Sequence, residues 1–504
     1  MRRASYIILF LLAAFLITQA AFSLQWPIAH DEAPLFYEAF LMQSEGRIPY
    51  RDIFDFQMPG SYLAYYLLGM FSGFGPFRIR ILDLLILAAL IFITFHAMRR
   101  FGKTPALAAG ILFGLKYLQG GPSLSLQREY LLLVFIALSL LIGMRESLTP
   151  KHRLSLGILF GLSAVIKPHA ALGLLPFLLF DIADIRQRPN MTLPKAAWTS
   201  LLPAAIGFAI PVSLVILYLT ITNSLSPFLT IALNYWPLYS QINGQMEITP
   251  TAERISFLLN QIWRLGGSGL WLIPAAFGLY LNRNRQTYLL ASLALCYAIY
   301  PALSGQFFPY HYIPFIYIII LLASLAIATN YQLPITNLSS FLFSLSSSIL
   351  LITILLTIRP STTFLRQIQG HPIATSTDRA EEIVRFLEKN LQAGETVQPL
   401  DWTGGTLLAL LETRTPIATS YVFDFYFYHH VSNPYIQSLR VDFMNQLQTA
   451  SPRYIVEVIA IDKPWVSGED TTRDFPELRE FLNENYSVTM DRNDYIIYEL
   501  DDGP

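Results

Sequence analysis

Charged side chains are concentrated in one stretch, HDEAPLFYEAFLMQSEGRIPYRDIFDFQMPG at positions 30–60. A carboxylate such as that of Asp31 or Glu32 can take a proton from an attacking hydroxyl group, and a guanidinium can bind a phosphate. The stretch follows the first long apolar run by a few residues, so we expect it at a membrane face. Such a place suits a reaction between a lipid-borne molecule and a second substrate. The charged residues are Asp31, Glu32, Glu38, Glu45, Arg47, Arg51, Asp52 and Asp55.

Three further motifs place polar side chains at the ends of apolar runs. They are SLQREYLLL with Arg128 and Glu129, VIKPHAAL with Lys167, and GQFFPYHYIPF with His311 and Tyr312. Lys167 lies between two apolar stretches, where a cation is costly unless it lines a polar cavity or meets an anion. Arg128 and Glu129 can instead cap a helix or extend to the headgroups, and His311 also fits an aromatic belt.

The composition is that of a membrane protein. The chain has 504 residues, 53% of them hydrophobic, with a mean hydropathy of +0.44 and only 14% charged residues. Soluble globular domains contain about 25% charged residues. The net charge of −1 excludes a strong bulk attraction to nucleic acid. Cys296 is the one cysteine, so the chain can form neither an internal disulfide nor a cysteine zinc cluster.

Apolar runs of near-spanning length predict a polytopic α-helical membrane protein with about eleven spans. Lysine and arginine in the short loops fall on one side if the N-terminus is cytoplasmic. The first run also fits a signal peptide; in both cases the segment from Trp26 onward is outside. Asp83, near the outer end of the second run, is expected to pair with Arg78 or Arg80. The runs are 5–24, 78–98, 104–119, 127–145, 154–167, 169–183, 198–221, 268–282, 286–303, 312–329 and 339–358.

The composition changes after about residue 359, and 359–504 is predicted to be a soluble exoplasmic α/β domain. STDRAEEIVRFLEKN and FPELREFLNENY have the spacing of amphipathic helices. ETVQPLDW, PIATSYVF, RYIVEVIA and DYIIYEL are typical of strands. The run YVFDFYFYHH is interpreted as a core strand, with a sugar or lipid platform as the alternative. Residues 1–358 then form the transmembrane domain, with an exoplasmic loop at 25–77 that returns through the interfacial segment PGSYLAYYLLGMFSGFG.

The loop resembles the first exoplasmic loop of the GT-C superfamily of integral membrane glycosyltransferases. It is most similar to the bacterial protein-mannosyltransferase-like group, which includes lipid A aminoarabinose transferases and lipopolysaccharide-core transferases. The matching pieces are the pair Asp31–Glu32, the motif GRIPYRD at 46–52 and Pro59–Gly60. PYHYIPF is similar to the HY motif of a late span in that group. No segment resembles the β-trefoil domain of eukaryotic protein mannosyltransferases.

The resemblance implies an inverting hexosyl- or pentosyltransferase that uses a polyprenyl-phosphate-linked sugar. Asp31 matches the catalytic acidic position and is the expected base, with Glu32 as its assistant or alternative. Arg128, Lys167 and His311 are the expected ligands of the departing lipid phosphate. The acceptor would be a lipid-linked glycan, a surface polysaccharide or a protein at the outer face of a bacterial plasma (inner) membrane.

Four more residues are predicted to bind substrate or shape the loop: Tyr50, Arg51, Asp52 and Tyr312. Arg51 can instead pair with Asp52 or Asp55, and we expect Asp55 to hold the shape of the loop. No P-loop or dinucleotide fingerprint is present, and we expect no cofactor. A divalent metal shared by the loop carboxylates is a minor alternative, and the prediction is that there is none.

Other functions compete with this one. Lys167 and the short helices at 154–183 would suit a transporter or a lipid-linked sugar flippase. The long loop at 222–267 would suit a polysaccharide polymerase or ligase, although shaping an acceptor cleft fits it better. A non-catalytic membrane scaffold is a further alternative, because fold does not imply function.

Overall fold

The computed structural model describes residues 2–327, 337–371, 373, 375–461 and 463–501. It divides into two compact units, each built from three segments of the chain. We call them the helical unit and the mixed unit. The helical unit comprises Met1–Gln25, Arg80–Ile216 and Ser256–Ile368, and the mixed unit comprises Trp26–Ile79, Leu217–Ile255 and Gln369–Pro504.

All eleven predicted apolar runs form helix, apart from residues 328 and 329 of the tenth run, which lie outside the described residues. Helix is the expected form because lipid offers no partner for backbone N–H and C=O groups. The helices are α1 (Arg2–Ser23), α4 (Pro76–Met98), α5 (Lys103–Gln119), α6 (Arg128–Gly143), α7 (Pro150–Ile166), α8 (Leu174–Arg186), α9 (Leu193–Ile221), α12 (Leu272–Leu281), α13 (Arg285–Ser304), α14 (Ile313–Ser324) and α15 (Asn337–Thr357).

Six of the described helices are long and apolar enough to cross a membrane, or seven if the bent pair Ser344–Thr357 and Thr362–Ile368 counts as one span. α5, α6 and α7 have 17, 16 and 17 residues and fall just below that length. The chain is thus an integral membrane protein, and the count of about eleven spans stays a prediction.

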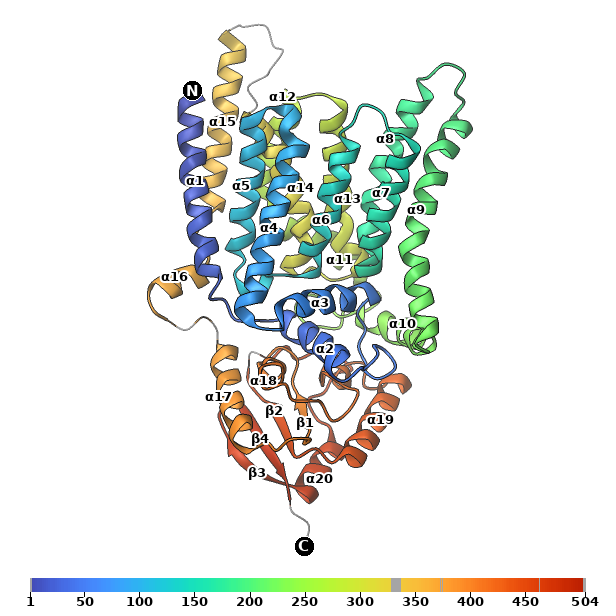
Figure 1. Cartoon of the computed structure of the whole chain (residues 1–504), viewed down its shortest axis with the longest axis vertical. Helices are drawn as coiled ribbons and strands as arrows, with labels where there is room; N and C mark the ends of the chain where they lie inside the picture. Colours follow the sequence, from blue (N-terminus) through green and yellow to red (C-terminus); the bar gives the residue numbers. More distant parts are fainter. Residues whose placement is uncertain (1, 328–336, 372, 374, 462, 502–504) are drawn as a thin grey trace. The chain divides into compact units, whose positions relative to one another are not determined.

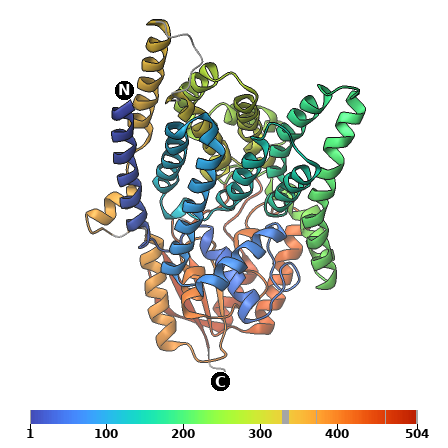
Figure 2. The same ribbon diagram turned by 45° about the horizontal axis from the view of Figure 1, so that its top comes forward.

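The centre of the helical unit is α14, which packs against α5, α6, α12 and α13 (Figures 1 and 2). Its segment Pro309–Ile327 is 89% buried, whereas the spans of α1 and α9 are 17% and 22% buried. Glycines allow α7 and α9 to approach closely: a Cβ at Gly157 would lie 2.0 Å from the carbonyl oxygen of Ala204. Small residues at such contacts are typical of helix packing in membranes.

The sheet of the mixed unit has four strands in the order β1-β2-β4-β3. β1 (Val397–Leu400) and β2 (Tyr454–Val458) are parallel, with Val397 opposite Tyr454. β4 (Tyr495–Leu500) is antiparallel to β2 and to β3 (Tyr486–Asp491). The predicted strands in ETVQPLDW, RYIVEVIA and DYIIYEL are confirmed, and β3 was not predicted.

Two strand predictions are wrong. PIATSYVF forms only isolated bridges, at Ile417 with Val397 and at Tyr421 with Phe54. Beyond Ile417 the Gln398 side chain, rather than a strand backbone, bonds the N–H of Thr419 and the carbonyl of Tyr421. YVFDFYFYHH is irregular apart from the 3₁₀ turn η8 (Phe425–Phe427). Its successive aromatic side chains are all buried rather than alternating.

Helices surround this sheet and include segments from far apart in the sequence. The predicted helices are confirmed as α17 (Thr375–Asn390) and α20 (Pro476–Asn485). Within the mixed unit, α18 (Thr406–Thr413) packs on α2 (Glu32–Ser44), and Tyr37 on α2 donates a 2.8 Å hydrogen bond to the carbonyl of Thr415. The compact units therefore differ from the ranges 1–358 and 359–504, whose roles as membrane and soluble domains stay a proposal. The remaining α-helices among the described residues are α2 (Glu32–Ser44), α3 (Pro59–Ser72), α10 (Leu225–Tyr239), α11 (Arg254–Ile262), α16 (Thr362–Ile368), α18 (Thr406–Thr413) and α19 (Pro434–Ala450).

The predicted interfacial segment contains α3, which has one exposed apolar face. Leu63, Leu67, Met70 and Phe71 are between 42% and 72% exposed, and their spacing places them on one side of the helix. Tyr62 and Tyr65, on the opposite side, are buried. This amphipathic pattern favours a helix lying in a membrane interface.

Candidate functional site

A buried carboxylate, Glu129, is the centre of a polar cluster in the helical unit. Its Oε1 lies 3.2 Å from Nζ of Lys167 and 3.5 Å from Nε2 of His311, and it accepts a 3.2 Å hydrogen bond from the hydroxyl of Tyr300. Glu129 is fully buried and His311 is 1% exposed. Arg128 precedes Glu129 in the chain and is 4% exposed. The cluster therefore combines cations with one carboxylate in a site that excludes most water.

Helix ends and short turns bring these residues together. Arg128 and Glu129 begin α6, and Lys167 is the C-cap residue directly after α7, where an extended backbone and Pro168 end the helix. His311 lies in the 3₁₀ turn η6 (Pro309–Tyr312) that leads into α14, and its Nδ1 is 2.9 Å from the carbonyl oxygen of Gln306. The lysine side chain keeps 17% of its surface exposed.

The structure thus places two of the three predicted phosphate ligands, Lys167 and His311, on one carboxylate, with Arg128 at the same helix start. Sequence reasoning assigned no role to Glu129 and did not identify Tyr300. Tyr300 offered no signal, because it stands within the apolar run of α13. Glu129 did offer one, since a buried lysine requires an anion nearby.

A second buried network in the helical unit surrounds Asp83. Its carboxylate accepts hydrogen bonds from the hydroxyl of Tyr117 at 2.6 Å and from that of Ser125 at 2.7 Å. Arg80 donates to Ser125 at 2.6 Å and lies 4.0 Å from Asp83. The expected pairing of Asp83 with Arg80 is confirmed. The network holds α4 against α5 and the start of α6.

Tyr312 follows His311 in the chain and is buried within the helical unit. Its ring packs closely against Gly266, since a Cβ atom at that glycine would lie 2.6 Å from the ring. Its hydroxyl donates a 3.5 Å hydrogen bond to the carbonyl of Gln261. These contacts fix the position of the turn that carries His311. Its predicted role in substrate binding stays a prediction.

In the mixed unit, Asp31 and Glu32 stand at the start of α2. Asp31 occupies the N-cap position without a capping hydrogen bond from its own side chain, and its Oδ1 lies 2.9 Å from Nδ1 of His30. His30 adopts a φ of 53°, a conformation that costs a non-glycine residue energy and often marks a functional turn. Glu32 is fully buried and accepts a 3.2 Å hydrogen bond from the N–H of Ala29. Glu32 therefore stabilises the turn. The neighbouring Asp31 is also buried, with 5% of its surface exposed.

Tyr50, Arg51 and Asp52 form one tight turn. Arg51 donates two hydrogen bonds to Asp52, at 2.8 and 2.9 Å, and Asp52 also accepts from the N–H of Ile48. The hydrogen bond from Arg51 holds the pKa of Asp52 below its usual range. The hydroxyl of Tyr50 donates to the carbonyl of Gln57 at 2.6 Å. These bonds make the three residues well suited to fixing the shape of the loop.

Asp55 links the loop to the C-terminal part within the mixed unit. The fully buried carboxylate accepts hydrogen bonds from Tyr62 at 2.8 Å and from Tyr426 at 3.0 Å, and from the N–H of Phe56. The shape role expected for Asp55 fits these contacts. Burial, followed by the repulsion of Asp55, raises the pKa of both tyrosine hydroxyls well above the ordinary value.

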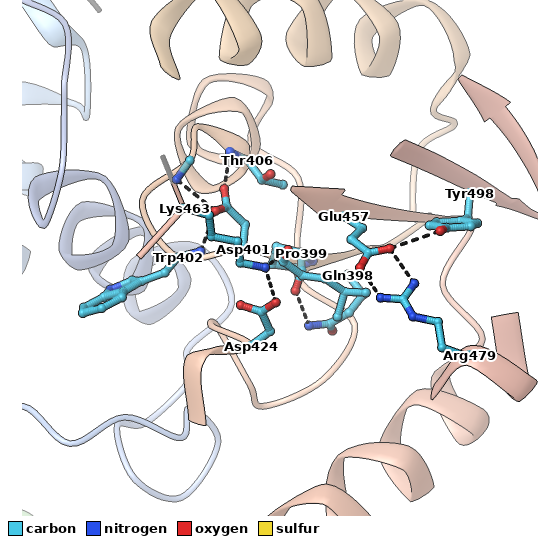
Figure 3. A network of polar contacts seen from close by, with 12 residues as sticks. Gln398, Pro399, Asp401, Trp402, Thr406, Asp424, Glu457, Lys463, Arg479 and Tyr498 are labelled. Atoms are coloured by element: carbon cyan, nitrogen blue, oxygen red, sulfur yellow. Dashed lines mark hydrogen bonds and ion pairs between the residues drawn. The ribbon is translucent and has the colours of Figure 1, made fainter. Parts of the chain in front are cut away.

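The C-terminal ends of β1 and β2 carry a further network that sequence reasoning missed (Figure 3). The buried Lys463 donates to the carbonyl of Leu400 at 3.1 Å and forms an ion pair with the buried Asp424. Burial raises the pKa of Asp424, and Lys463 opposes that rise. Asp401 accepts hydrogen bonds from three backbone N–H groups, among them that of Thr406 at the start of α18. The network anchors the loop after β1. Among the described residues, no three His, Cys, Asp or Glu side chains gather in an arrangement for a metal.

The comparisons agree with the resemblance read from the loop. Residues 59–218 match the dolichyl-phosphate-mannose-protein mannosyltransferase family. The structure of ArnT from Cupriavidus metallidurans bound to undecaprenyl phosphate superposes with a TM-score of 0.61 at 12% identity, covering 98% of this chain and 99% of that one. The apo form of ArnT gives a TM-score of 0.55 at 12% identity, over 99% and 98% of the two chains.

The oligosaccharyltransferase AglB from Archaeoglobus fulgidus, in complex with an inhibitory peptide and a dolichol-phosphate, has a TM-score of 0.43 at 13% identity, over 89% of this chain and 69% of that one. No curated protein sequence matches the chain. The chain therefore has the fold of a GT-C membrane glycosyltransferase, and residues 59–218 carry the sequence pattern of the dolichyl-phosphate-mannose-protein mannosyltransferase family.

Proposed function

We propose that the protein transfers a sugar from a polyprenyl-phosphate-linked donor to an acceptor at the outer face of the membrane, with inversion at the anomeric carbon. The observation that carries this proposal is the cluster of Lys167 and His311 on the buried Glu129. It occurs in a fold whose ArnT example was crystallised with undecaprenyl phosphate. A fixed cation such as Lys167 in a dry site stabilises a departing phosphate well, and the imidazole of His311 can donate a hydrogen bond to it.

On the donor side, the leaving phosphate gains negative charge as the bond to the sugar breaks. Lys167 supplies a point charge, and Arg128 can present two parallel N–H groups to two phosphate oxygens. Glu129 holds the ammonium of Lys167 and the ring of His311 in place, so that little reorganisation is needed when charge develops. The partial exposure of Lys167 leaves room for the phosphate to approach.

On the acceptor side, we assign the base to Asp31. An acceptor hydroxyl must lose its proton as it attacks the anomeric carbon, and the proton passes to a carboxylate within hydrogen-bond distance. Asp31 contacts His30 on a strained turn, which suits a group held for chemistry. Glu32 assists by holding that turn, because its own carboxylate is engaged by the N–H of Ala29. Tyr50, Arg51, Asp52 and Tyr312 shape the substrate region.

The surrounding assignments follow from the same fold. We place the N-terminus in the cytoplasm and the C-terminal α/β part outside a bacterial inner membrane, because the basic residues of the short loops then fall inside. The donor is a hexosyl or pentosyl polyprenyl phosphate. The acceptor is a lipid-linked glycan, a surface polysaccharide or a protein.

The test is sugar transfer by the purified full-length protein, offered a panel of polyprenyl-phosphate sugars. We expect turnover with at least one donor and a loss of about 10²- to 10⁴-fold in Asp31→Asn, since a general base contributes that much. Glu45→Gln is the matched control, because it removes an exposed carboxylate from the end of α2. Full activity in Asp31→Asn would remove the base assignment. If the wild type turns over no donor but moves solute across vesicles, the protein is a transporter or flippase instead.

A further inference from the structure

A cleft in the helical unit lies between the ends of α4 and α6, apart from the Glu129 cluster. It has a volume of about 520 Å³ and is open to the surroundings. Charged and polar side chains of Arg100, Arg145, Glu146, Ser147 and His96 line it, together with the apolar Ala97, Leu141 and Met144. Ala97 and Met144 are buried and form its floor. The cleft thus combines a basic rim with an apolar base.

The two arginines of the cleft differ from Arg153 and Arg285, which form ion pairs in the same unit. Arg153 forms a 2.7 Å ion pair with Asp181, and Arg285 pairs with Asp184 at 2.6 Å. Arg100 and Arg145 form neither a hydrogen bond nor an ion pair with any residue that the structure describes. Two guanidinium groups that line one cleft without hydrogen bonds to the protein favour an anionic ligand with several acceptor oxygens, although Glu146 interacts electrostatically with Arg100.

The position of the cleft along α4 indicates where that ligand comes from. The apolar span that ends here, Pro76–Phe101, has 26 residues, which correspond to about 39 Å of helix. A hydrocarbon core is about 30 Å thick, so the last residues of the span reach the headgroup layer. Apolar side chains continue from the cleft along the bundle surface, where Phe92 is 64% and Leu141 37% exposed. An amphiphile would therefore meet charge at one end and apolar surface along its length.

We propose that the Arg100–Arg145 cleft binds the phosphate of an anionic phospholipid, whose acyl chains lie along the surface next to Leu141. Basic pockets between membrane helices suit such headgroups. Glu146 reduces the charge of the rim to a formal +1 for Arg100, Arg145 and Glu146 together. The cleft therefore selects a singly charged phosphodiester rather than a highly charged anion. This site is independent of the transfer reaction proposed above.

The test counts lipids bound to the purified full-length protein in detergent by native mass spectrometry. Phosphatidylglycerol supplies the anionic headgroup, phosphatidylcholine the zwitterionic one, and inorganic phosphate the free anion. We expect wild type to prefer phosphatidylglycerol and Arg100→Ala/Arg145→Ala to bind it about 30-fold more weakly, since each basic residue near a membrane contributes roughly a factor of five. Glu146→Gln should bind it more tightly.

Arg186→Ala/Arg188→Ala is the matched control, because it removes two exposed arginines at the end of α8 and changes the net charge equally. It should retain at least a third of the wild-type affinity. Thermal melting without lipid checks that both double variants are folded, and Arg100→Lys/Arg145→Lys should recover part of the affinity. Equal weakening in both double variants, equal binding of phosphatidylcholine, or displacement of the lipid by millimolar inorganic phosphate would each overturn the proposal.

Discussion

Replacement of Lys167 by methionine separates two roles that its ammonium can play. It can neutralise Glu129, or it can bind the donor phosphate. The Nζ to Oε1 distance of 3.2 Å corresponds to a Coulomb energy of about 5 kcal/mol at an effective dielectric constant of about 20. Because Glu129 is fully buried, removal of its partner leaves an uncompensated charge, which typically costs about 3–5 kcal/mol. We expect the lower end, since His311 and Tyr300 still contact the carboxylate.

The double variant Glu129→Gln/Lys167→Met removes both charges and should recover most of that stability in a thermal unfolding assay. Its rate of transfer is the decisive measurement. If Lys167 stabilises the leaving phosphate, single-turnover transfer stays about 10²- to 10³-fold slow, as for the loss of one preorganised donor. A double variant with the wild-type rate would refute the phosphate role and leave Lys167 as a counterion of Glu129.

A buried ion pair elsewhere in the helical unit provides the control. Arg153 and Asp181 are each 3% exposed in their side chains and form a 2.7 Å pair. Arg153→Met should lower the melting temperature as much as Lys167→Met does. Its transfer rate at a temperature where the protein is folded should stay within a factor of about three of the wild type. A parallel loss of rate in Arg153→Met would mean that the assay reports stability rather than chemistry.

Three further predictions concern the mixed unit. Asp55→Asn weakens the acceptor of two tyrosine hydroxyls and should lower the free energy of unfolding by about 1–3 kcal/mol, measured by denaturant titration; Tyr426→Phe should cost less, because it removes one of those bonds. Lys463→Met should lower the free energy of unfolding by about 3–5 kcal/mol, because it leaves Asp424 buried without a cation. The double variant Lys463→Met/Asp424→Leu should be close to the wild type in stability. A double variant as unstable as the single one would contradict the ion-pair reasoning. Burial lowers the pKa of His429 to about 3, so between about pH 3 and about pH 6.5 the unfolded chain binds a proton that the folded chain does not. The stability from neutral His429 is complete above about pH 6.5 and falls by about 1.4 kcal/mol per pH unit as the pH drops from there toward 3. The variant His429→Phe should lack this slope, so the slope should appear in the difference between the unfolding free energies of wild type and variant.

Periodicity and length predicted the helices well because each apolar run is decided locally. In lipid a backbone group can bond only within its own helix, so the eleven runs needed no knowledge of their neighbours. Strands depend on partners instead. β3 was missed because Ser487 to Thr489 are exposed at the edge of the sheet, and the Thr419 segment was misjudged because a single side chain, Gln398, takes the place of a strand.

The candidate site likewise combines features that single residues indicate with features that depend on distant partners. Lys167 was predicted because a cation within apolar sequence is energetically costly, and His311 because its motif resembles a family motif. Each of these arguments needs only the local sequence. The role of Glu129 depends on three turns meeting at one point, and the hydroxyl of Tyr300 joins them from the middle of an apolar helix. Nothing in the spacing of these residues encodes the meeting point. Packing of α6 and α13 against α14, and of α7 against α6, creates it.

The partners of the buried carboxylates distinguish a reactive site from a supporting one. Asp55 and Asp83 are held mainly by hydroxyl groups, which satisfy a carboxylate without presenting a charge to a ligand. Glu129 is held by an ammonium and an imidazole, and the side chain of Lys167 keeps 17% of its surface exposed. The partly exposed Lys167 thus differs from the fully enclosed Asp55 and Asp83 networks, as we expect for the external phosphate ligand that we propose.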